Sequence, residues 1–125
     1  MTPEKTEYDL IVVGSGAAGL TAALVASIKG LDVLLLERAD VLGGTTAISA
    51  GSAWVPNSHY DTSDKDSKAN ARRYLDATVG GHAPDDLKDA FLDAAPAMAR
   101  LLADHSEVRF CAYPHLPDYY SERDG

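Results

Sequence analysis

Residues 8–51 read YDLIVVGSGAAGLTAALVASIKGLDVLLLERADVLGGTTAISAG and contain two glycine-rich turns that indicate the fold class. The first turn, GSGAAG, directly follows an apolar run and precedes an alanine-rich segment. Glu37 ends the next apolar run, 18 residues after Gly19. The fingerprint of a dinucleotide-binding βαβ unit is a glycine-rich turn between a strand and a helix, together with an acidic residue at the end of the next strand.

The expected elements follow from the flanking residues. The apolar run at residues 9–13 predicts a strand buried on both faces. Residues 17–29 predict a helix, with Gly30 as its left-handed C-terminal cap, and residues 31–36 predict a second strand. The fold class is therefore α/β, with a Rossmann-like unit at residues 1–56 followed by a mainly helical segment at 57–125. A βαβ unit that binds nothing is the structural alternative.

Each position in the first turn has a separate task. Gly14 allows the tight turn, Gly16 lets the backbone approach a pyrophosphate, and Gly19 lets the helix pack closely. The free N–H groups at the helix start favour a bound phosphate. Glu37 is positioned to accept hydrogen bonds from ribose hydroxyls and disfavours the 2′-phosphate of NADP. The candidate cofactor-binding residues here are Gly14, Ser15, Gly16, Ala17, Ala18, Gly19 and Glu37.

The second turn, Gly43-Gly44, begins a loop rich in small and hydroxyl-bearing residues. Small side chains let a backbone lie along a flat or charged ligand, and hydroxyls can donate to phosphate or ring acceptors. An NAD-binding fold does not need this loop. An ordinary flexible loop is the alternative on composition alone.

Glu37-Arg38 followed by Gly43-Gly44-Thr45-Thr46-Ala47 and Ser49 resembles the FAD-binding signature of flavoproteins related to fumarate reductase and succinate dehydrogenase. Trp54-Val55-Pro56-Asn57 and Pro117-Asp118-Tyr119-Tyr120 resemble the 3-ketosteroid Δ1-dehydrogenase branch, as do Arg73-Tyr74-Leu75, Gly80 and Ala94-Ala95-Pro96-Ala97-Met98. Ala50 and Ser58 depart from that branch, which usually has glycine and asparagine there. The resemblance implies that FAD binding extends to Arg38, Gly43, Gly44, Thr45, Thr46, Ser49, Ala50 and Gly51.

The resemblance also implies a chemistry. Flavin dehydrogenation passes a hydride to the flavin, and a base removes a proton from the adjacent carbon. In the resembling branch this proton step depends on tyrosines, and Tyr119 matches one of them. We therefore expect Tyr119 to be catalytic, as part of the base or of a proton relay, although a tyrosine needs activation because its ordinary pKa is about 10. Tyr120 is then a wall of the substrate pocket. No histidine lies at residues 45–49, so we expect non-covalent FAD.

Composition excludes several classes of partner. The chain has 125 residues, of which 46% are apolar, and this fraction argues against a disordered chain. Its formal charge of −8 argues against nucleic acid and anionic membranes as partners. No apolar run approaches the length of a membrane span. The lone cysteine, Cys111, cannot form an internal disulfide, and no histidine lies at metal-ligand spacing, so we expect no metal site. A cytoplasmic protein is the default expectation.

The second half predicts helices that support rather than form a site. One helix begins near residues 64–67 and ends at Gly80-Gly81, and another begins at Pro84. Pro96 is expected to interrupt this second helix, and residues 108–112 to form a short strand. The histidines, His59, His82, His105 and His115, have no predicted role.

Three functions remain open. The leading one is an FAD-dependent dehydrogenase that acts beside a ketone, with a 3-ketosteroid as the small apolar substrate and an external electron acceptor. The others are a fumarate-reductase-like enzyme for a small dicarboxylate and a non-catalytic nucleotide-binding remnant. The resembling proteins are several times longer and place ketone-polarising groups and a further relay tyrosine in their second half. We therefore expect an N-terminal fragment that is inactive and binds FAD poorly by itself.

Overall fold

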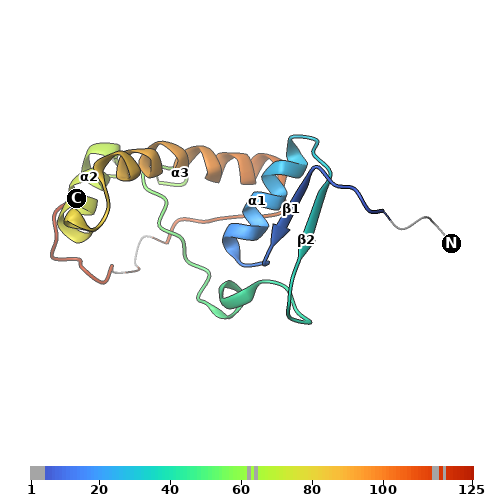
Figure 1. Cartoon of the computed structure of the whole chain (residues 1–125). Coiled ribbons are helices and arrows are strands. Elements are labelled where there is room, and N and C mark those ends of the chain that lie inside the picture. Colours follow the sequence, from blue (N-terminus) through green and yellow to red (C-terminus); the bar gives the residue numbers. More distant parts are fainter. Residues whose placement is uncertain (1–4, 62, 64, 114–115, 117) are drawn as a thin grey trace. The chain divides into compact units, whose positions relative to one another are not determined.

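The computed structural model describes residues 5–61, 63, 65–113, 116 and 118–125. The chain folds into two compact units, Met1–Ala53 and Trp54–Gly125 (Figure 1). We call these the nucleotide unit and the helical unit. The assignment of functions to residues 1–56 and 57–125 stays a prediction.

The nucleotide unit is a partial Rossmann-like βαβ unit, as the sequence predicts. It consists of β1 (Leu10–Val13), α1 (Ala17–Ile28), β2 (Val33–Leu36) and the 3-10 helix η1 (Gly44–Ile48). The strands are parallel, with Leu10 opposite Val33 and Val13 opposite Leu36. Helix α1 packs against both strands (Figure 1). The crossover places the first turn and the end of β2 at the same edge of the sheet.

Local backbone chemistry sets both ends of α1. The helix begins after Gly16, whose extended backbone serves as the N-cap. At the other end Gly30 has a φ of +83°. Its N–H donates to Ser27 O at 2.9 Å, and the N–H of Leu31 donates to Ala26 O at 3.1 Å. This pair of bonds is a Schellman motif, which confirms the expected glycine cap.

The strands are less buried than the sequence predicts. Ile11 is 55% exposed and Val13 is 82% exposed. The expectation of burial on both faces is therefore wrong for the described part of this unit. The reason is that α1 covers one face of the sheet, and alternate side chains of a strand point to opposite faces.

The helical unit is built on two helices joined by a short turn. Helix α2 (Lys68–Thr78) begins at Ser67, whose hydroxyl accepts a hydrogen bond from Asn70 N at 3.2 Å. The 3-10 turn η2 (Gly80–His82) leads to α3 (Asp85–His105). The buried side chains of α3 recur at helical spacing and form the core with Ala71 of α2; they are Lys88, Leu92, Ala95, Ala99 and Leu102.

Two expectations about this unit are wrong. Helix α3 runs through Pro96 without interruption, although proline removes one backbone hydrogen bond. Burial of Leu92, Ala95 and Ala99 on either side of Pro96 offsets that loss. Residues 108–112 form no strand in the described part of the chain, since no second strand lies beside them for pairing. Asp64, His115 and Pro117 lie outside the described residues.

A network of charges joins α2 to α3. Lys88, 6% exposed, contacts Asp76 at 2.7 Å and Asp85 at 2.9 Å. Arg72 contacts the same two carboxylates and also Asp89, at 2.7 Å. These bonds raise the pKa of Lys88, with Asp76 as the main cause, and lower that of Asp76 itself. Lys88 can therefore lie in the core because its charge is fully paired.

Candidate functional site

The first glycine turn has the backbone geometry that a dinucleotide site requires. Gly14 has a φ of +95° and donates from its N–H to Leu36 O at 2.7 Å. A Cβ on Gly19 would lie 1.9 Å from Gly14 O. Both positions therefore require glycine, one for its conformation and the other because the backbone lies against it.

Gly16 faces open space instead. A Cβ built there would meet nothing closer than Thr46 Oγ1, at 4.0 Å. Thr46 Oγ1 accepts a hydrogen bond from Ala17 N at 3.1 Å. No acceptor within the described chain bonds the N–H groups of Ala18 and Gly19. This helix start fits a pyrophosphate, because it offers two N–H donors and a hydroxyl beside an approachable backbone.

Glu37 is held by the first turn. Its Oε2 accepts hydrogen bonds from Ser15 N at 2.9 Å and Ser15 Oγ at 2.5 Å, and its Oε1 accepts from Ala39 N at 2.9 Å. The Ser15 hydroxyl, followed by the Ala39 N–H, lowers the pKa of Glu37 to about 2. The carboxylate is therefore ionised at neutral pH, and it retains acceptor capacity for a ribose hydroxyl.

The second turn is joined to the first. Gly43 has a φ of +111°, and a Cβ there would lie 2.6 Å from the Cβ of Ala47. Its N–H donates to Ser15 Oγ at 2.9 Å. A Cβ on Gly44 would lie 3.5 Å from Gly16 Cα. The structure thus brings together both glycine turns and Glu37, which are far apart in the sequence.

The remaining predicted cofactor residues are exposed. Arg38, Thr45, Ala50 and Gly51 lie on the surface of this unit, as does Ser49. The hydroxyl of Ser49 donates to Thr46 O at 2.8 Å and accepts from Gly51 N at 3.1 Å, which orders the end of the loop. Their contacts with a cofactor stay predictions.

The tyrosine segment of the helical unit presents Tyr119 to solvent. Tyr119 is 97% exposed and Tyr120 is 44% exposed. The guanidinium of Arg123 lies 4.3 Å from the centroid of the Tyr120 ring and donates to Ala77 O on α2. Arg123 therefore fastens this segment to α2, a role that no sequence pattern indicated.

A second fastening point is the bond between Tyr74 and Asp118. The Tyr74 hydroxyl donates to Asp118 Oδ2, and this bond raises the pKa of Tyr74 and lowers that of Asp118. Asp118 Oδ2 also accepts from Tyr120 N at 3.3 Å. Tyr74 was not predicted as a site residue, since its only signal in the sequence was a place in the Arg73-Tyr74-Leu75 motif.

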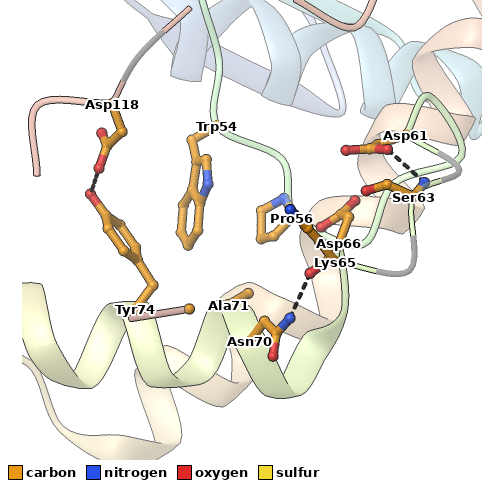
Figure 2. A pocket seen from close by; sticks show the side chains of 11 residues that line it. Trp54, Pro56, Asp61, Ser63, Lys65, Asp66, Asn70, Ala71, Tyr74 and Asp118 are labelled. Carbon is orange, nitrogen blue, oxygen red and sulfur yellow. Dashed lines mark hydrogen bonds between the residues drawn. The ribbon is translucent and has the colours of Figure 1, made fainter. Parts of the chain in front are cut away.

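A pocket of about 280 Å³ lies beside this bond (Figure 2). Trp54, Pro56, Asp66 and Tyr74 line it. The Trp54 ring lies 5.4 Å from that of Tyr74 and stacks on Phe91 at 5.8 Å. Neither Tyr119 nor Tyr120 lines this pocket. Their predicted roles in catalysis and substrate binding therefore stay predictions.

Other candidate chemistry is sparse in the described ranges. Cys111 is exposed, and among these residues no cluster of three or more histidine, cysteine, aspartate or glutamate side chains is arranged to hold a metal. No helix in the same ranges has the length and apolar character needed to cross a bilayer.

Comparison with known proteins identifies the family to which these features belong. The model of the FAD binding domain family matches residues 9–125. The chain is 43% identical over 121 residues to 3-oxosteroid 1-dehydrogenase of Mycolicibacterium smegmatis, covering 95% of this chain and 21% of the relative. It is 37% identical over 126 residues to 4-oxocyclohexanecarboxylate 2-dehydrogenase of Sinomonas cyclohexanicum, covering 99% of this chain and 22% of the relative.

A solved structure is similar as well. It is 3-ketosteroid delta1-dehydrogenase from Sterolibacterium denitrificans in complex with 1,4-androstadiene-3,17-dione. The TM-score is 0.73 at 42% identity, with 78% of this chain and 17% of that chain covered. The chain thus spans about a fifth of the length of the relatives it matches.

Proposed function

Because the chain belongs to the FAD binding domain family, we propose that it works as part of a flavoenzyme that dehydrogenates a carbon–carbon bond beside a ring ketone. The proposed substrate is a 3-ketosteroid and the proposed reaction is 1,2-dehydrogenation. The observation that carries this proposal is the 43% identity to a 3-oxosteroid 1-dehydrogenase across 95% of the chain. The names of two relatives share the oxo group and the dehydrogenase activity, which supports the ring ketone more broadly than the steroid.

In this proposal the nucleotide unit holds non-covalent FAD. The N–H groups of Ala18 and Gly19 and the hydroxyl of Thr46 bind the pyrophosphate, and Glu37 binds the adenosine ribose. When bound, FAD supplies the acceptor for a hydride from the substrate. An external electron acceptor would be needed to complete each turnover. A cytoplasmic location stays a prediction from the sequence.

Tyr119 supplies the proton chemistry in the same proposal. Its hydroxyl is part of the base or of the proton relay that takes a proton from the carbon next to the ketone, while the neighbouring carbon loses a hydride. The two departures leave a C=C bond conjugated with the ketone. Tyr120 forms one wall around the substrate. The support for these roles is the resemblance of the Pro117-Asp118-Tyr119-Tyr120 motif and the exposure of Tyr119.

The decisive experiment follows flavin absorbance in the protein expressed from its complete reading frame. A 3-ketosteroid added without oxygen is expected to bleach the visible flavin band. Tyr119→Phe should slow this bleaching by at least about 100-fold and leave FAD content unchanged, since it removes only the proton acceptor. Tyr113→Phe is the matched control, because Tyr113 is 70% exposed.

Other outcomes separate the alternatives. Bleaching by 4-oxocyclohexanecarboxylate but not by the steroid would keep the ring ketone and replace the substrate. Oxidation of dithionite-reduced enzyme by fumarate, with no response to either ketone, would support the dicarboxylate enzyme. A colourless protein that takes up no added FAD would support the nucleotide-binding remnant.

A further inference from the structure

The Ser15 side chain is sealed inside the nucleotide unit. Ser15 is 0% exposed, and its hydroxyl makes two hydrogen bonds. It donates to Glu37 Oε2 at 2.5 Å and accepts from Gly43 N at 2.9 Å. The Ser15 N–H donates to the same carboxylate oxygen at 2.9 Å. One small side chain thus joins the first turn, the end of β2 and the second turn.

This geometry separates Ser15 from the residues around it. The hydroxyl can donate a single hydrogen bond, and Glu37 Oε2 already accepts it. The side chain also has no solvent-accessible surface to offer a ligand. Gly16, Ala17 and Ala18, in contrast, lie at the accessible start of α1. Ser15 therefore acts on a cofactor through its neighbours and not by touching it.

We propose that Ser15 is a positioning residue, whose hydroxyl holds Glu37 against the adenosine ribose and holds the second turn closed over the start of α1. This proposal rests on FAD binding at the two turns and does not depend on the substrate. Loss of the hydroxyl releases the Glu37 carboxylate from its strongest contact. It also leaves the N–H of Gly43 unpaired in a buried position.

Two effects on binding follow from this arrangement. The ribose loses an oriented acceptor, and the second turn loses the bond that fixes its first residue beside Ser15. Both effects weaken the holding of FAD, while the reacting end of the cofactor is untouched. The expected signature is a change in cofactor affinity without a change in turnover at saturating FAD.

The test measures the dissociation constant for FAD in the protein expressed from its complete reading frame. Ser15→Ala is expected to raise this constant about tenfold, with kcat at saturating FAD within about twofold of the parent value. Ser15→Cys keeps a donor, although a weaker and somewhat larger one, and should fall between the two. Ser27→Ala is the control, because Ser27 lies exposed on α1 and its variant should match the parent.

A double-mutant cycle with Glu37→Gln distinguishes positioning from a general loss of stability. If Ser15 acts through the carboxylate, Ser15→Ala should cost much less in the Glu37→Gln background than in the parent. An FAD analogue without the adenosine ribose hydroxyls should likewise show a smaller difference in affinity between Ser15→Ala and the parent, because only the effect through the second turn remains. An unchanged dissociation constant, or equal effects in both backgrounds, would overturn the proposal. Failure of steroid turnover would leave these binding results interpretable.

Discussion

In the nucleotide unit the site is shaped by backbone, through glycine turns and one buried hydroxyl, whereas in the helical unit shape comes from packed side chains. A Cβ on Gly19 would lie 1.9 Å from Gly14 O, and Ser15 has no exposed surface. In the helical unit the core consists of Leu92 and its neighbours on α3, beside the paired charge of Lys88. We therefore expect the nucleotide unit to be sensitive to single methyl groups added in its turns, and the helical unit to be sensitive to lost volume in its core.

The largest effect is expected from Gly19→Ala. The new methyl group would overlap a backbone oxygen that cannot move without opening the first turn. FAD content after purification should fall to below about a tenth of the parent value, with loss of structure in the nucleotide unit. Gly81→Ala is the control, because a Cβ there meets nothing within 4 Å. Full FAD content in Gly19→Ala would show that this turn adapts.

Leu92→Ala tests the other side of the comparison. Leu92 is 2% exposed, so its truncation should leave a cavity and destabilise the helical unit by about 3 kcal/mol. Urea denaturation followed by circular dichroism measures this change. Leu87→Ala, at a position that is 58% exposed, should cost far less. Equal costs at both positions would contradict the assigned core.

How well each unit can be predicted from the sequence follows the same division between backbone geometry and side-chain packing. Gly14, Gly19 and Gly30 could be placed in advance, because each glycine meets a local backbone requirement that few other residues satisfy. Continuous α3 across Pro96 could not, because it depends on burial of Leu92 and Ala99 by a tertiary contact. The role of Ser15 was hidden as well, since spacing marks it as one more member of a ligand-binding turn.

Tyr74→Phe should have a smaller and more selective effect. It removes the hydroxyl that binds Asp118 and leaves the ring against Trp54. Turnover of a 3-ketosteroid by the complete protein should fall roughly 5- to 20-fold, because the segment that carries Tyr119 loses one anchor. Tyr8→Phe, in the nucleotide unit, is the control. A parallel loss of FAD content in Tyr74→Phe would show instead that the effect lies outside the helical unit.

Alkaline pH is expected to have the smallest effect, a loss of stability in the helical unit. The pKa of Tyr74 is raised, chiefly by its bond to Asp118, and that of Lys88 is raised, chiefly by Asp76. A raised pKa in the folded state gives stability that is complete below the ordinary value, about 10 for either group, and is lost as pH rises further. In the nucleotide unit the pKa of the exposed Lys5 is raised in the same direction, chiefly by Asp32, whereas Glu37, with its pKa lowered to about 2, has no transition in this range.

The chain has one tryptophan, Trp54, and it packs on Tyr74 and Phe91, so its fluorescence reports the helical unit. This signal should stay constant up to about pH 10 and then change. Tyr74→Phe should remove one part of the change. A transition centred below pH 9 in the parent protein would contradict the assigned bonds.

The two-stranded sheet has a consequence for handling the 125-residue chain. In the described residues β1 and β2 pair with each other, so each strand has an outer edge with unpaired N–H and C=O groups. Ile11, Val13 and Leu36 add apolar surface to this sheet. Such edges recruit strands from other molecules. Self-association that grows with concentration is therefore the expected colloidal behaviour of this chain, and dilute solutions are the place to study it as a monomer.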